Sequence, residues 1–96
     1  MNTKEDYKQK IEAELALAQA KLAEFQARAK VASADTRISY NEHVHDMGEK
    51  FDATKAKLKG FGEASDGAWE NLKDGVENAW HSLSDSVKDA TAKFKA

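Results

Sequence analysis

Two histidines near the middle of the chain are the residues whose types could bind a metal ion. His43 and His45 are two positions apart, so on a helix they point about 200° away from each other and cannot share a metal. His45 and Glu49 are four apart and share a helix face, which supplies at most half of a zinc site. We therefore expect His45 and Glu49 on a solvated face, and His43 packed beside Tyr40 and Met47.

No other set of residues predicts catalysis. The chain has no Cys, and none of its serines lies in a G-x-S-x-G motif. Gly60 and Gly62 precede an acidic stretch, which would repel the phosphate that a glycine-rich loop binds. The carboxylates all fit exposed helix positions. The sequence predicts a protein that is not an enzyme and holds no cofactor and no metal ion.

The composition favours a nearly all-helical chain. Its 96 residues include no Pro, and 33% of them are charged. Proline is common in loops, so its absence indicates few turns and one small domain spanning residues 1–96. The N-terminus has no apolar stretch typical of a signal peptide, and no run approaches the ~20 apolar residues of a membrane span. We expect a cytoplasmic protein.

The charges argue against nucleic acid as a partner. The net charge is −2, and both signs are interleaved along the chain. Residues 61–96 carry four Lys or Arg and seven Asp or Glu. No segment has the basic surface that binds nucleic acid, and the acidic C-terminal part does not favour anionic lipid.

The C-terminal third contains an eleven-residue repeat, W-E-N-L-K-D-G-V-E-N-A followed by W-H-S-L-S-D-S-V-K-D-A. Eleven residues make about three helical turns, so the repeated apolar residues fall in one stripe along a helix. This core stripe comprises Trp69, Leu72, Val76, Trp80, Leu83, Val87 and Phe94. The stripe must be buried against a partner helix, or against lipid or another protein.

The N-terminal part shows the alternating four- and three-residue steps of a coiled coil. Its apolar seam begins with Ile11, Leu15, Leu22 and Phe25. A stutter between Thr36 and Tyr40 interrupts the pattern, and it fits either a continuous helix or a turn capped by Ser33 or Asp35. No Gly or Pro lies between Ala32 and Tyr40, so we favour continuity.

The expected architecture is an antiparallel helical hairpin with one long and one shorter helix. The long helix covers about 4–59, the turn about 60–65 and the second helix about 65–94. The turn is placed at Gly60 and Gly62, with Ser65 or Asp66 as N-cap of the second helix and Thr3 as N-cap of the first. The alternative is a three-helix bundle with breaks near 34 and 62.

The unequal lengths predict self-association. The shorter helix covers half of the long one, which leaves the seam of Ile11, Leu15, Leu22 and Phe25 open to form an oligomer. A dimer that completes a four-helix bundle is the simplest solution. A second apolar line on the same helix also suits a larger bundle: Leu17, Val31 and Ile38.

Nearly the whole chain resembles a family of small bacterial coiled-coil proteins described as stress-response proteins after a cyanobacterial member. The resemblance is carried by the opening M-N-T-K-E-D-Y, by A-D-T-R-I-S-Y-N-E, and by S-D-G-A-W-E-N-L-K-D-G-V-E-N-A-W followed by D-S-V-K-D-A. It implies a helical, cytoplasmic, oligomeric protein linked to stress, with no catalytic residues.

Two hypotheses follow for the function. The first is a non-catalytic structural or interaction protein that acts through self-association. The second is an amphipathic protein that binds a lipid or membrane surface through its eleven-residue repeat, inserting Trp69, Trp80 and Phe94.

Overall fold

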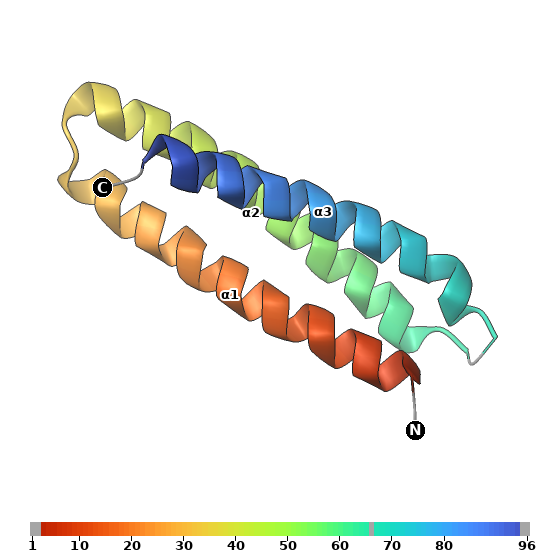
Figure 1. The fold of residues 1–96 in the computed structure, drawn as a ribbon. Helices are drawn as coiled ribbons and strands as arrows, with labels where there is room; N and C mark the ends of the chain where they lie inside the picture. The colour runs from red at the N-terminus through yellow and green to blue at the C-terminus, as the bar shows by residue number, and fades with distance from the viewer. Residues whose placement is uncertain (1–2, 66, 95–96) are drawn as a thin grey trace.

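The structure is a computed structural model that describes residues 3–65 and 67–94 as three α-helices (Figure 1). α1 spans Thr3–Val31, α2 spans Ala34–Glu63 and α3 spans Trp69–Lys93. The helices lie side by side in a bundle 51 Å long and 19 by 18 Å across. The described residues form no strand, and the predicted all-α class is confirmed.

The prediction of one continuous helix over about 4–59 is wrong, because the chain turns at Ala32 and Ser33. Ser33 is extended, with φ −62° and ψ 163°, and its carbonyl accepts a hydrogen bond of 2.7 Å from the Arg37 amide. The Arg37 guanidinium donates to the Ala32 carbonyl at 3.2 Å. The first break therefore falls near the place where the three-helix alternative put it.

Burial of apolar surface explains why the chain turns here. A straight helix would leave the seam of α1 in water, whereas the turn lays α1 antiparallel to α2 and buries Ile11, Leu15 and Phe25. Each such side chain contributes about 1.5–3 kcal/mol when it leaves water. That total exceeds the cost of losing a few helical hydrogen bonds at the turn, each worth about 1 kcal/mol net.

The second turn lies later than the predicted 60–65, because α2 continues through Gly60 and Gly62 to Glu63. Phe61, which stands between the two glycines in the sequence, is fully buried. Its packing in the core stabilises the helical conformation of this segment. The second helix begins at Trp69 rather than 65, after Ala68, with no side-chain cap. Of the expected N-caps, Ser65 supplies only its carbonyl, to the Ala68 amide at 3.0 Å. Asp66 and the Thr3 side chain lie outside the described residues.

The core consists of two clusters, one toward each end of the bundle. The cluster nearer the N-terminus contains the buried residues Ile11, Leu15, Ala18, Leu58, Phe61, Val76 and Leu83. The cluster nearer the C-terminus contains Phe25, Ala29, Tyr40, Met47 and Ala90. Between them, the buried Thr54 hydroxyl is satisfied by the Lys50 carbonyl at 2.8 Å.

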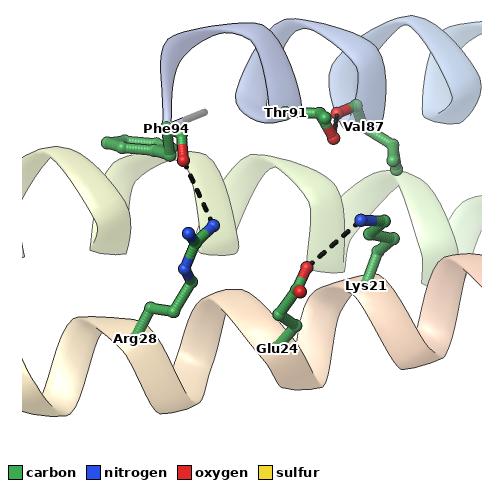
Figure 2. Close-up of polar contacts among 6 residues, drawn as sticks. All are labelled: Lys21, Glu24, Arg28, Val87, Thr91 and Phe94. Atoms are coloured by element: carbon green, nitrogen blue, oxygen red, sulfur yellow. Dashed lines mark hydrogen bonds and ion pairs between the residues drawn. The ribbon is translucent and has the colours of Figure 1, made fainter. Parts of the chain in front are cut away.

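Two cationic side chains of α1 donate hydrogen bonds to carbonyl groups at the C-terminal ends of α2 and α3. Lys4 Nζ donates to the Ala64 carbonyl at 2.6 Å, and Arg28 Nη1 donates to the Phe94 carbonyl at 3.1 Å (Figure 2). Helix C-termini leave carbonyls unpaired and carry partial negative charge, so cations stabilise them. α1 therefore supplies a cation to the C-terminal end of both α2 and α3.

Candidate functional site

The core stripe of α3 faces α1 and α2, but the depth of its residues varies. Val76 and Leu83 are fully buried, and Leu72 is 42% exposed. The remaining four residues are half-buried: Trp69, Trp80, Val87 and Phe94. Most of the stripe therefore packs against the chain's own helices, and its two Trp side chains lie at the edge of the core.

The most buried line of α3 repeats every seven residues rather than every eleven. It runs through Val76, Leu83 and Ala90, and all three are essentially inaccessible to solvent. A seven-residue spacing keeps one line against neighbouring helices. Ala90 and the buried Ser86 lay outside the predicted stripe, and this spacing was the signal that would have found Ala90.

The four residues assigned to an oligomer seam lie inside the chain's own core. Ile11, Leu15 and Phe25 are buried and Leu22 is half-buried, so the assignment of these side chains to an oligomer contact is corrected. The physical reason is the turn at Ala32–Ser33, which brings α2 and α3 onto the face that a straight helix would have left open.

An aromatic cluster closes the end of the bundle where α3 finishes. The Phe94 ring stacks on Tyr40, with centroids 3.8 Å apart and planes at 19°, and also contacts Phe25 at 6.0 Å. His43 meets Phe94 edge to face at 5.2 Å. His43 and Tyr40 thus both contact the Phe94 ring, which lies at the end of another helix and could not be predicted from spacing within one helix.

Tyr7 places a phenol in the interface between α1 and α3. Its hydroxyl is buried and lies near the Glu77 carboxylate, but it makes no hydrogen bond of good geometry among the described residues, while Lys73 Nζ lies 5.0 Å from its ring centroid. Burial, followed by the nearby carboxylates of Glu77, Glu14 and Asp74, raises the pKa of Tyr7 to about 12. The side chain is neutral at pH 7 and is therefore suited to packing rather than to proton transfer.

One polar bond joins α2 to α3 at the edge of the core. The Ser86 hydroxyl donates to the Asp46 carboxylate, which also pairs with Lys50 Nζ at 3.1 Å. The Ser86 bond, and then Lys50, lower the pKa of Asp46 below its ordinary value of 3.8. The carboxylate thus stays ionised and holds two helices together.

His45 and Glu49 form a surface pair, with Nε2 and Oε1 2.8 Å apart and both side chains mostly exposed. No group of three or more His, Cys, Asp or Glu side chains in the described part of the chain is arranged to hold a metal ion. The pair therefore stands alone on the outer face of α2.

The feature with the chemistry of a binding site is a groove between α1 and α2, on the side that α3 leaves uncovered. A hollow of about 770 Å³ lies between residues 8–19 of α1 and 51–63 of α2. Apolar side chains form its floor: Leu15, Ala16, Phe51, Ala56 and Leu58. Charged side chains form its rim: Lys8, Glu12, Asp52, Lys55, Lys59 and Glu63. We call this surface, with its continuation toward Ala32, the α1–α2 groove.

The rim charges of this groove form no close ion pair with other residues of the described part of the chain. None of the ion pairs or side-chain hydrogen bonds formed by residues 3–65 and 67–94 involves them. A second hollow of about 660 Å³ continues the groove toward the turn, lined by Gln26, Ala29, Lys30, Arg37, Asn41 and Val44.

Outside the groove, three large apolar side chains of α1 and α2 are exposed, in addition to Leu72 of α3. Leu17 is 70%, Val31 87% and Ile38 60% exposed. These are the residues of the predicted second apolar line, and no helix of the described chain covers them. None of the described helices is long and apolar enough to cross a bilayer.

Comparison with family models, with curated proteins and with solved structures gave no match to this chain.

Proposed function

We propose that this protein is a non-catalytic structural or interaction protein that acts by self-association of its helical bundle. The observation that carries the proposal is the α1–α2 groove, which combines an apolar floor with a rim of six charged side chains that form no ion pair within residues 3–65 and 67–94. Such a surface suits a protein contact, because it offers apolar area and leaves charges of both signs for a partner.

The polar side chains inside the bundle support a structural role. Lys4 and Arg28 cap helix ends, and Ser86 binds Asp46 across two helices. Each of these groups is engaged in holding the fold. A cytoplasmic location and a role under cellular stress are part of the same proposal, and they rest on the resemblance of the sequence.

The mass of the purified protein in solution tests the proposal. Light scattering across a range of concentrations should give a mass that rises from one chain, 10.6 kDa, to a defined oligomer, with a dimer favoured. A mass that stays at one chain up to millimolar concentration would contradict self-association.

A second candidate function is binding to a lipid surface through α3. The half-burial of Trp69 and Trp80 and the exposure of Leu72 favour it, because these side chains lie at the edge of the core. Opening of α3 would present them to the interface of a neutral bilayer, where Trp is favoured. Trp emission should then shift to the blue with neutral vesicles, and an unchanged spectrum would exclude this function.

A further inference from the structure

The two hollows of the α1–α2 groove lie on the same face of the bundle. Asp52 lines the first hollow and Val44 lines the second, and Gly48 lies four residues from each. Positions four apart share a helix face, so Gly48 lies on the face between the two hollows, although it lines neither of them. No α3 residue lines either hollow, so this face of the bundle has no third helix over it.

Along the first hollow, two pairs of charges on the two walls have opposite signs at matching heights. α1 and α2 are antiparallel, and the Lys8 side chain lies against Gly62, 3.3 Å from where a Cβ would stand. Glu63 therefore lies opposite Lys8. One turn further along both helices, Lys59 lies opposite Glu12. At these two heights each wall thus carries a charge opposite to that on the facing wall, whereas the charged residues of the second hollow, Lys30 and Arg37, are both cationic.

We propose that the partner of this groove is the same groove of a second copy, with the two copies related by a two-fold axis parallel to the helices. This geometry places α1 of each copy over α2 of the other at the same height. Glu12 then meets Lys59 of the second copy, and Lys8 meets Glu63 of the second copy. A two-fold axis repeats each contact, so the dimer contains four new ion pairs. This inference rests on the proposed self-association and assigns its surface.

The charges disfavour the end-for-end arrangement. With the two-fold axis across the groove at the first hollow, α2 packs on α2. Lys55 and Lys59 of one copy then approach the same two lysines of the other. Like charges brought together at an interface oppose association. The parallel arrangement is the one that pairs opposite signs.

The middle of the groove is shaped for close approach. Gly48 lies inside α2, where glycine costs about 1 kcal/mol relative to Ala, yet a Cβ there would meet nothing within 4 Å. The chain's own packing therefore does not require glycine at this position. Ala23 stands on the opposite wall, between Gln19 and Gln26. Gly48 and Ala23 of the second copy would let the helices meet closely.

The available area is sufficient for a stable contact. One long face of the bundle measures 51 by 19 Å, which is on the order of 1,000 Å² and exceeds the roughly 800 Å² per partner of a standard interface. The groove runs along most of this face.

Charge reversal followed by mixing tests the proposal. Glu12→Lys and Lys59→Glu each replace attractive contacts with repulsive ones, so each variant alone should dimerise about tenfold more weakly at low salt, by analytical ultracentrifugation. An equimolar mixture should form the heterodimer, because the Glu12→Lys chain carries only positive charges at these two positions and the Lys59→Glu chain only negative ones. Native mass spectrometry of the mixture measures that preference, and circular dichroism confirms that each variant folds.

A matched pair of glycine substitutions tests the same surface without changing charge. Gly48→Gln places a side chain in the groove and should weaken the dimer. Gly60→Gln changes another helical glycine of α2 that also has open space, but one that lies about 120° around the helix from Gly48, and it should leave the dimer intact. Both variants should keep the monomer fold, because Gln favours helix over Gly.

The outcomes separate this inference from the proposed function. A wild-type dimer that both charge variants leave unchanged, or a mixture without heterodimer preference, would overturn the groove assignment while self-association stands. A wild-type chain that remains monomeric would overturn both. A monomer whose Trp emission shifts with neutral vesicles would assign a membrane instead of a second copy, and would overturn the inference as well.

Discussion

Ser86 and Asp46 connect α3 to α2 through a hydrogen bond of 2.5 Å, in which the Ser86 hydroxyl donates to the Asp46 carboxylate. Ser86 is only 4% exposed, whereas the Asp46 side chain is 48% exposed. A buried donor thus meets an acceptor that water still reaches. This geometry makes the bond sensitive to the ionisation of Asp46.

Ser86→Ala should lower the free energy of unfolding by about 1 kcal/mol at pH 7, near the low end for a bond to a charged group because water screens Asp46. The folded-state pKa of Asp46 is lowered from 3.8, so its contribution is present above that value and is lost as the pH falls through the lowered pKa. Urea unfolding of both proteins should therefore show a difference at pH 7 that shrinks well below pH 3.8. Ser82→Ala, at an exposed position on the same helix, is the control and should change little.

Two leucines of α3 test the depth of the core stripe. Leu83 is 1% exposed and Leu72 is 42% exposed, although both occupy the same position of the eleven-residue repeat. Leu83→Ala should cost about 2–5 kcal/mol of stability because it leaves a cavity, and Leu72→Ala less than about 1 kcal/mol. Denaturant unfolding measures both, and equal losses would show that α3 does not pack as described.

The glycines near the end of α2 should respond differently to Ala. A Cβ at Gly60 meets nothing within 4 Å, so Gly60→Ala should stabilise the protein by up to about 1 kcal/mol. A Cβ at Gly62 stands 3.3 Å from the Lys8 side chain, so Gly62→Ala should gain less. Thermal unfolding of the two variants compares them, and a loss of stability in Gly60→Ala would mean that α2 ends before this residue.

Tyr7→Phe should leave stability at pH 7 unchanged or raise it by about 1 kcal/mol, because it removes a buried hydroxyl that makes no hydrogen bond of good geometry within residues 3–65 and 67–94. The folded-state pKa of Tyr7 is about 12 against 10.0 for a free side chain. Its contribution is therefore complete below pH 10 and declines as the pH rises toward 12. The wild type should lose stability relative to Tyr7→Phe over that range. If the free energies of unfolding of the two proteins changed in parallel from pH 9 to pH 12, the phenol of Tyr7 would not be buried as described.

The sequence predicted the helical class and the face of α3 that turns inward, because apolar periodicity reports burial directly. It favoured a straight helix through Thr36–Tyr40 because no Gly or Pro marks a break there, and this was wrong, since a stutter is compatible with both a turn and a straight helix. The decision depends on whether Ile11 and Phe25 find a surface to cover them, which is a property of the whole chain.

The opposite error occurred at Gly60 and Gly62, where local propensity predicted a turn and tertiary packing of Phe61 maintained the helix. The α1–α2 groove was missed for a different reason. Glu12 and Lys59 each look like solvated helix residues in the sequence. Their relationship exists only once the antiparallel register of α1 and α2 is known.

The short turns at Ala32–Ser33 and after Glu63 also bear on how the protein reaches its native state. Each helix packs on the one that follows it in the chain, so most native contacts close small loops and cost little chain entropy. Helical proteins with such local connectivity fold within about microseconds to milliseconds. A newly made chain would therefore bury Phe25 and Leu83 quickly. Rapid burial shortens the time during which exposed apolar side chains can aggregate with other molecules.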